Sequence, residues 1–530
     1  MSVLEQIFSP DYWNKFEITK DDLEFLFNRL LELEEPQTID QLLEPLIINR
    51  IKNEKLAFNR KQTEEATLYK PKDSYSVDQL LIFPAIHWIK GKVVSSRPGY
   101  NPQIGEFSVI QVDVGNNVIR QFASQLESHA LNDFEISTDI EDENDFKDIF
   151  DQYGDVIRVK LTESLETDPD LVRIAGCYFP KSLLIDINQG NLNLSEAILE
   201  EVNGGPLPTQ KLIEQVEIPP NVNKRLVEFS MNYALQEDNR FDEVGPTGET
   251  LWFLRRLEPE WVQNTSPYLN PGKQTIDPEL YLPVIQELEN QVEDELSTLT
   301  AADERQEEIE ISLIFPHWRA GTLPLSQNVA TFFPTADEAP RIQFIFIDAE
   351  SDASFPGWVV RPSKYVYGLK DWYDQHGLIP GSIVKLTRGK NPGEIRIHVE
   401  KRKQNREWVR TALIGADGGI VFAMLKQIVT ATFDERMAIA IPDVDAVDTL
   451  WKSGKQRGNL ESTLDLMSQE LAKLNPQGHI HAQELYACLN LVRRCPPDLV
   501  IYTLSTNSKY QSVGNLYYRF AEISGDSTHE

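Results

Sequence analysis

The stretch KYVYGLKDWYDQHGLIPGSIVKLTRG, residues 364–389, combines a helical pattern, a tight turn and an alternating strand pattern. Leu369 and Trp372 are spaced for one face of a short helix, and Gly381 follows a proline, as is typical of a turn. The residues after the turn (SIVKLTR) alternate polar with apolar side chains, which is the period of a strand with one buried face. We therefore expect one short helix packed among the strands of a small barrel.

Further strand patterns lie on both sides of this stretch, between Ile309 and Arg410. In chain order they are EISLIFP, RIQFIFIDA, PGWVVRP, SIVKLTR and EIRIHVEKR, with the turn HWRAGTLPLS after the first. In the last of them, strand alternation directs Ile395, Ile397 and Val399 to the interior. Strands that flank one short helix predict a closed barrel.

The order of these elements resembles the B-three class of DNA-binding pseudobarrels, which also occurs in some restriction endonucleases. The matching positions are Gly368-Leu369, Trp372-Tyr373, Leu378 and Gly381-Ser382. Leu369 stands where that family has Trp, and Ser382 stands where it has Asp. The resemblance therefore concerns the fold more than any close relative.

The resemblance implies two arms that enter the major groove of double-stranded DNA, one after the first strand and one before the helix. The implied residues are His317, Trp318 and Arg319 in the first arm and Arg361, Ser363 and Lys364 in the second. Arg and Lys side chains can contact base edges or phosphates. The alternative interpretation is a solvated strand face that contacts no nucleic acid.

A basic run follows the opening stretch, from Lys385 to Arg410. Its candidate DNA contacts are Arg388, Lys390, Arg396, Lys401, Arg402 and Lys403. Three or four phosphate contacts would make the logarithm of affinity fall with the logarithm of salt with a slope of about −3. The alternative is that this run offsets the protein's own acidic segments, within the chain or between subunits.

The charge of the 530-residue chain is unevenly distributed. The net charge of −32 opposes nonspecific attraction to nucleic acid, because Lys and Arg supply the affinity for phosphates. Residues 133–155 and 286–310 each hold ten acidic residues against one basic residue, whereas residues 361–410 hold twelve basic and five acidic residues. We interpret residues 286–310 as a solvated helix or linker between two halves of the chain.

An internal repeat relates residues 194–257 to residues 464–523. Each copy predicts helix, turn, helix, a break at two prolines, helix and a hairpin, which is a winged-helix pattern. The hairpins begin alike, with Arg240-Phe241 in the first copy and Lys509-Tyr510 in the second. The second copy resembles the HARE-HTH type of winged helix found in the delta subunit of bacterial RNA polymerase.

The remaining patterns complete a prediction for the whole chain. Residues 1–68 are helical, with Thr38 as an N-cap, and strands are expected from residue 69 onward, among them 155–162 (DVIRVKLT) and 171–179 (LVRIAGCYF). The fold class is multidomain α+β, with small β-barrels alternating with winged-helix domains in two barrel-plus-winged-helix halves. The predicted domains are a helical module (1–68), an SH3-like barrel region with an acidic insert (69–190), a winged helix (191–260), an acidic helical linker (261–308), the pseudobarrel (309–412), a β/α connector (413–458) and a HARE-HTH-like winged helix (459–530).

Motifs for catalysis, metals and cofactors are not found in the sequence. His479 and His481 would lie on one side of a strand, but no third ligand stands at metal spacing, and GADGG at 415–419 lacks the Lys and Ser or Thr of a phosphate-binding loop. We expect no cofactor, no metal and, on balance, no enzymatic activity. No apolar run reaches the ~20 residues that a membrane helix needs, so we expect a cytoplasmic protein without a membrane partner.

The leading hypothesis is a non-enzymatic, DNA-associated regulatory protein. Its pseudobarrel would contact double-stranded DNA and its C-terminal winged helix would contact a partner protein, because the third helix of that domain (PPDLVIYTLSTNSKY) is largely apolar. The first alternative is an acidic protein-interaction scaffold or RNA-polymerase accessory factor that does not bind DNA directly. The second is the specificity component of a defence or restriction system.

Overall fold

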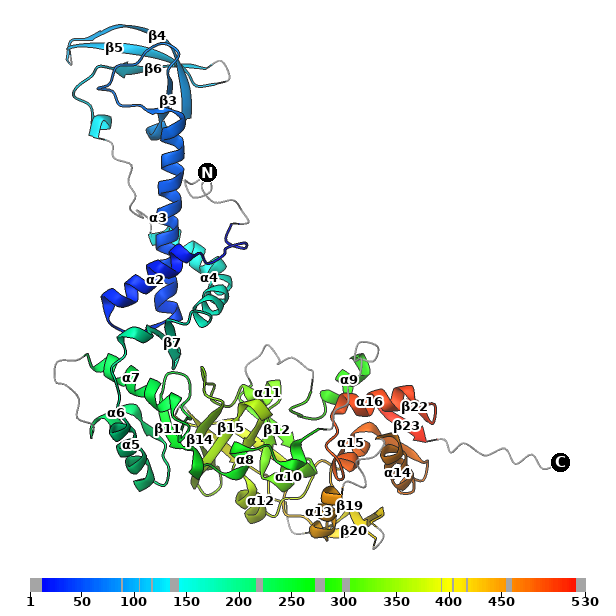
Figure 1. Ribbon diagram of the computed structural model, residues 1–530. Helices are drawn as coiled ribbons and strands as arrows, with labels where there is room; N and C mark the ends of the chain where they lie inside the picture. Colours follow the sequence, from blue (N-terminus) through cyan, green and yellow to red (C-terminus); the bar gives the residue numbers. More distant parts are fainter. Residues whose placement is uncertain are drawn as a thin grey trace. The chain divides into compact units, whose positions relative to one another are not determined.

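The computed structural model shows a mixed α+β protein with several sheets (Figure 1). It describes residues 12–86, 89–103, 105–115, 118–133, 143–215, 223–271, 282–297, 306–391, 393–402, 405–415, 418–453 and 460–520. The chain forms two compact units, residues 1–184 with 223–226 and residues 185–222 with 227–530. In these described ranges, every helix is too short or too polar to cross a membrane.

In the described residues of the first unit, three α-helices pack on a small sheet. The elements are α2 (Lys20–Leu33), β1 (Gln37–Thr38), α3 (Ile39–Glu65), α4 (Glu143–Glu166), β7 (Leu171–Ile174) and β8 (Cys177–Pro180), with the sheet order β1-β8-β7. Thr38 caps α3 as predicted: its side chain accepts a hydrogen bond from the backbone N–H of Gln41. The core joins α3 and α4 through Leu42, Leu46 and Ile157. The predicted boundary at residue 68 therefore separates β1 from its partner β8.

A five-stranded sheet is inserted between α3 and α4. Its strands are β2 (Thr67–Leu68), β3 (Leu80–Phe83), β4 (Ile89–Asn101), β5 (Gly105–Asp113) and β6 (Ile119–Ser124), paired in chain order. Val93, Ile110 and Val112 are buried in its core. Between residues 69 and 124, strands are therefore observed as expected.

Residues 155–162, predicted as a strand, lie instead within α4. Val156 and Val159 are β-branched, which favours a strand in a local reading of the sequence. However, Ile149, Ile157, Leu161 and Leu165 recur at intervals of four or eight residues and are buried together. The helical period determines the outcome because it places these side chains on one face, while Val159 is left 58% exposed.

The second unit contains the same order of elements twice more. The first set is α5 (Gln189–Glu201), β9 (Leu207–Pro208), α6 (Thr209–Ile213), α7 (Lys224–Glu237), β10 (Phe241–Glu243) and β11 (Leu251–Leu254). The second set is α14 (Leu460–Ala472), β21 (His479–His481), α15 (Ala482–Asn490), α16 (Pro497–Thr506), β22 (Tyr510–Gly514) and β23 (Tyr517–Phe520). In both sets, as in residues 20–180, the last strand lies between the first and the second in the sheet. In the part of the chain that the structure describes, the helix, strand, helix, helix, strand, strand module thus occurs three times, once more than the sequence repeat indicated.

A curved, barrel-like sheet of seven strands lies between these two sets. The strands are β12 (Glu308–Ser312), β13 (Thr322–Pro324), β14 (Arg341–Asp348), β15 (Ser354–Val360), β16 (Tyr365–Tyr367), β17 (Ile383–Arg388) and β18 (Glu394–His398), in the order β12-β17-β18-β14-β15-β16-β13. Only β14 and β18 pair in parallel among these strands. Three short helices accompany them: α10 (Phe315–Ala320), α11 (Gln327–Ala330) and α12 (Lys370–His376).

The opening stretch packs in this sheet as predicted. Leu369, Trp372 and Leu378 are buried in the barrel core, and Ile395, Ile397 and Val399 face the same interior. Gly381 has φ +92°, and a Cβ at this position would lie 2.4 Å from the backbone of Ala438. Only glycine fits this turn without strain.

Two smaller regions complete the second unit. A hairpin of β19 (Arg406–Ile414) and β20 (Ile420–Ile428) precedes α13 (Val444–Ser453). The residues before the barrel contain α8 (Glu260–Gln263), a short 3-10 turn (Pro267–Leu269) and α9 (Leu282–Glu289). The acidic segment 286–310, predicted as solvated, is instead partly buried: Asp294 and Glu295 are 0% and 3% exposed. Their burial is possible because Arg494, itself buried, forms ion pairs with both carboxylates.

Candidate functional site

The first predicted arm forms α10 and packs into the protein. His317 is fully buried, with Nδ1 2.8 Å from Oγ1 of Thr322 and Nε2 2.8 Å from Oε2 of Glu295. Trp318 donates a hydrogen bond from Nε1 to the carbonyl oxygen of Leu378 at 2.7 Å. The assignment of His317 to an exposed arm is corrected by this burial, because its imidazole is enclosed by protein atoms.

Arg319, the third residue of that arm, is held by acidic and aromatic neighbours. Its guanidinium donates from Nη2 to Oδ2 of Asp448 at 2.7 Å, and its Cζ lies 5.7 Å from the ring centroid of Tyr268. The hydrogen bond to Asp448 and the charge of that carboxylate raise the pKa of Arg319. Arg319 thus has an intramolecular counter-ion.

The second predicted arm lies between β15 and β16. Arg361 donates from Nη1 to the carbonyl oxygen of Ala339 at 2.8 Å, and the hydroxyls of Ser363 and Thr265 are 2.7 Å apart. Lys364 is exposed and has a left-handed backbone conformation with φ 51°. Of the six arm residues, Arg361 and Lys364 are the two that are exposed.

Residues 259–271, the covering segment, contact both arms. The hydroxyl of Tyr365 donates to the carbonyl oxygen of Trp261, and Nε of Arg341 donates to the carbonyl oxygen of Val262 at 3.0 Å. Val262 and Leu269 of this segment share a buried cluster with Ala320 of the first arm and Tyr365 beside the second. The covering segment therefore packs against residues adjoining both arms.

The basic residues that follow α12 are largely paired with other groups of the protein. Arg396 lies 2.8 Å from Asp352, Lys401 pairs with Glu350, and Arg402 lies 2.8 Å from Glu407. Arg388 donates to the carbonyl oxygen of Thr331 and stacks over Phe332. Lys390 is exposed, and Lys403 lies outside the described residues. Because residues 306–402 hold 11 basic and 12 acidic residues, the barrel has no cationic surplus.

The apolar third helix of the C-terminal module is covered by the chain's own α9. Ile285 and Leu288 of α9 belong to one buried cluster with Val500 and Ile501 of α16. The surface on which we expected a protein partner is thus already occupied along this contact. A partner of this module would have to bind elsewhere on it.

An open cleft of the second unit lies where the β10–β11 loop (residues 244–250) meets the barrel strand β14. The backbone N–H of Gln343 donates to the carbonyl oxygen of Val244 at 3.0 Å, and that of Thr247 donates to the carbonyl oxygen of Thr335 at 2.7 Å. These bonds hold the loop against the barrel on one side of the cleft. The cleft has a volume of about 790 Å³ and is lined by Pro206, Pro246, Thr247, Gly248, Glu249, Leu251, Pro334, Thr335, Gln343, Phe344, Ile345, Gly393 and Glu394.

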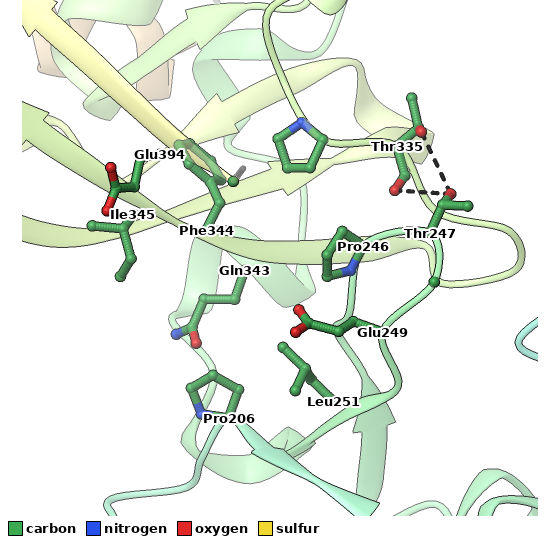
Figure 2. A pocket seen from close by; sticks show the side chains of 13 residues that line it. Pro206, Pro246, Thr247, Glu249, Leu251, Thr335, Gln343, Phe344, Ile345 and Glu394 are labelled. Carbon is green, nitrogen blue, oxygen red and sulfur yellow. Dashed lines mark hydrogen bonds between the residues drawn. The ribbon is translucent and has the colours of Figure 1, made fainter. Parts of the chain in front are cut away.

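The walls of the cleft combine carboxylates with apolar surface. Figure 2 shows Glu249 on the loop and Gln343 on β14 facing the same space, with Ile345 and Glu394 nearby. Ile345 is 41% exposed, which is unusual for a large apolar side chain of the barrel. Lys, Arg and His are absent from the described residues that line the cleft.

Hydrogen bonds favour the charged form of Glu394. Asn391 donates from Nδ2 to Oε1 at 2.7 Å and from its backbone N to Oε2 at 3.1 Å. These bonds lower the pKa of the Glu394 carboxyl, which favours its charged form. Glu243, directly before the loop, has the opposite behaviour: burial, followed by the charges of Glu338 and Asp337, raises its pKa to about 8.

Sequence reasoning did not find this cleft because its lining comes from positions 206 to 394 and has no common spacing. Groups of three or more potential metal ligands are absent from the described part of the chain. His481 is the N-cap of α15, and burial, followed by the charge of Arg436, lowers its pKa to about 4. Comparison of the chain with protein-family models, with curated protein sequences and with solved structures gives no match.

Proposed function

We propose that the protein is an acidic protein-interaction scaffold that binds a basic, extended segment of a partner protein in the cleft beside β14. The observation that supports this proposal is the lining of the cleft, where Glu249 and Glu394 stand beside the apolar surface of Leu251 and Ile345. A Lys or Arg side chain would meet carboxylates there without a competing cation from the described lining.

The dimensions of the cleft suit such a segment. Its volume of about 790 Å³ lies within the range of ~300–1,000 Å³ that is usual for ligand sites. Three prolines in its walls restrict the backbone, which reduces the conformational entropy lost on binding. A segment with a cationic side chain followed by an apolar one would use both kinds of wall.

The third helices of the first and last modules support a protein ligand over DNA. The three modules have the element order that we expect of winged helices, and in such domains the third helix contacts DNA. In the first module this helix is α4, which holds seven acidic and three basic residues, and in the last module it is α16, against which α9 packs. Neither presents the cationic surface that phosphate contacts require.

Binding of a labelled peptide tests the proposal. The probe is a fluorescein-labelled peptide of alternating Lys and Val residues, and the control probe has Glu in place of Lys. We expect the full chain to bind the first peptide, and Glu249→Lys to weaken that binding by about tenfold, the effect of ~1.4 kcal/mol. Fluorescence anisotropy at low and high salt measures both, and affinity should fall as salt rises.

Glu127→Lys, an exposed position in the first unit, makes the same change in net charge and serves as the matched control. Equal affinities of the Glu249→Lys and Glu127→Lys variants would show that the peptide is attracted by the overall charge and not by the cleft. A gel shift with double-stranded DNA on the same preparation completes the test. Retarded DNA together with absent peptide binding would restore the hypothesis that the arms contact DNA.

A further inference from the structure

The β19–β20 hairpin exposes an unusual amount of apolar surface. Trp408 is 62% exposed and Ile428 is 60% exposed, and Val421, Met424, Leu413 and Leu425 follow at 49%, 41%, 41% and 38%. Because successive side chains of a strand point to opposite faces, both faces of the hairpin expose apolar side chains: Trp408, Met424 and Ile428 on one, and Leu413, Val421 and Leu425 on the other. Figure 1 shows the hairpin at the lower right of the second unit, below α14.

One edge of this hairpin is available for pairing. The outer edge of β19 is partly used, since the N–H of Ala412 donates to Ala440 at 2.9 Å and the N–H of Ala440 donates to Arg410 at 2.8 Å. In the described residues, β20 forms its ladder with β19 alone, over the nine pairs from Arg406↔Ile428 to Ile414↔Ile420. The opposite edge of β20 therefore offers a row of backbone donors and acceptors.

The charge of β20 indicates what kind of strand would pair with it. Natural edge strands are usually protected by several charges or a proline, but IVFAMLKQI contains one charge, Lys426, and no proline. A basic partner finds no carboxylate on this strand. A second copy of the chain, which has a net charge of −32, can approach here because the strand itself contributes no negative charge.

The side-chain order of β20 is compatible with pairing to itself. Antiparallel pairing over all nine residues places a two-fold axis at the central residue, Met424. Lys426 then lies opposite Phe422 of the second copy and not opposite another Lys426, so like charges do not meet. The other pairs are Ile420 with Ile428, Val421 with Gln427 and Ala423 with Leu425.

We propose that two copies of the protein associate through antiparallel pairing of their β20 strands. The two hairpins would form one four-stranded sheet with an isologous interface, the usual type in homodimers. The interface would bury Met424 and Leu425 at its centre and would close the exposed edges. This dimer does not depend on the cleft, which is lined by other residues.

Light scattering coupled to size exclusion tests this dimer with the full chain. We expect a mass of twice 60.6 kDa for the unaltered protein, and at least about a tenfold rise in the dimer dissociation constant for Met424→Lys, since a charge on an edge strand blocks pairing. Val159→Lys, at an exposed apolar position on α4, is the matched control and should stay dimeric. Higher salt should favour the dimer, because it screens the repulsion between the net charges of the two copies and the interface itself is apolar. Peptide binding in the cleft should instead weaken with salt, because it depends on attraction between opposite charges.

A second variant keeps the test decisive if Met424→Lys disturbs folding. In a Cys177→Ser background, Met424→Cys should form an intermolecular disulfide under mild oxidation, since the remaining cysteines, Cys488 and Cys495, are buried. Monomeric unaltered protein at about 100 µM, far above the dissociation constants of ordinary homodimers, would overturn the proposal. So would a dimer that Met424→Lys leaves intact, or a failure of Met424→Cys to cross-link.

Discussion

Oε2 of Glu295 lies 2.8 Å from Nε2 of His317, and both side chains are almost completely buried. The other carboxylate oxygen of Glu295 accepts a hydrogen bond from Nε of Arg494 at 3.1 Å. One carboxylate thus connects the barrel helix α10 with the residues that follow α15 in the C-terminal module. This contact joins two segments that are nearly 200 residues apart in sequence.

Removal of the cation from this network should destabilise the second unit strongly. Arg494→Ala leaves Asp294 and Glu295 buried without a counter-ion, and we expect a loss of about 3–5 kcal/mol. Urea denaturation followed by tryptophan fluorescence measures the loss. Arg396→Ala, which breaks an ion pair with the exposed Asp352, should cost only about 0–1 kcal/mol. Similar losses in the two variants would contradict a structural role for the buried network.

The same network should make stability fall in acid. Burial alone would raise the pKa of Glu295, but the charges of Arg494 and His317 outweigh burial and hold this pKa below its ordinary value. A depressed carboxyl pKa contributes stability above the unfolded value of about 4.3, and this contribution is lost as pH falls below it. Thermal unfolding between pH 6 and pH 3 should show the loss in the unaltered protein. In Glu295→Gln the decline over this range should be shallower, from a lower starting stability.

Ionisation of Glu243 should lower the stability of the protein at alkaline pH. Because burial and neighbouring carboxylates raise its pKa to about 8, the folded state prefers the protonated form. A raised carboxyl pKa contributes stability that is present below the unfolded value and disappears as pH rises through the folded value. Glu243→Gln, which stays neutral, should therefore melt higher than the unaltered protein at pH 9 and close to it at pH 5. An equal difference at both pH values would exclude titration of Glu243 as the cause.

Substitutions in the two arms test whether these residues stabilise the fold or contact DNA. Arg319→Ala removes the hydrogen-bonded ion pair with Asp448, which we expect to cost about 1.5–3 kcal/mol. Lys364→Ala, at an exposed side chain of the second arm, should stay within about 0.5 kcal/mol of the unaltered protein. Melting temperature and a gel shift are measured side by side. Loss of DNA retardation in the Lys364→Ala variant with unchanged melting would instead identify the arm as a DNA contact.

Gly381→Ala should destabilise the barrel more than the same substitution at a glycine where an added Cβ would meet no other described atoms. The new Cβ would meet backbone atoms of Ala438 at 2.4 Å and would require a positive φ. We expect a cost of at least about 2 kcal/mol from the backbone conformation and the steric overlap. Gly478→Ala is the matched control, since Gly478 also has a positive φ but a Cβ added there would have no described atom within 4 Å. Its cost should stay at about 1 kcal/mol.

Local patterns in the sequence were sufficient for many elements. Alternation in 394–399 correctly placed Ile395 and Ile397 in the interior, and the spacing of Leu369 and Trp372 correctly predicted a buried helical face. The capping pattern at Thr38 was also confirmed. These features depend on neighbours within one or two turns or strand periods, so the sequence contains them directly.

Other features depend on residues that are distant in sequence. The third copy of the module escaped detection because residues 66–142, with the inserted sheet, separate α3 from α4. The acidic stretch around Asp294 looked solvated because its counter-ion, Arg494, comes 200 residues later. The packing of the covering segment beside the arms was also not predicted. Its contact with Tyr365 joins two segments that are distant in sequence and cannot be inferred from either segment alone.

The sequence by itself determined the type of most elements and which face of each is apolar, because those properties follow from local periodicity and propensity. Only the tertiary structure decided which charges are available to a ligand. A Lys or Arg in a basic run contributes less to phosphate binding when a carboxylate of the same protein neutralises it. In the barrel, Arg396, Lys401 and Arg402 have such carboxylates, and in the cleft Glu249 and Glu394 have no cation among the described lining residues.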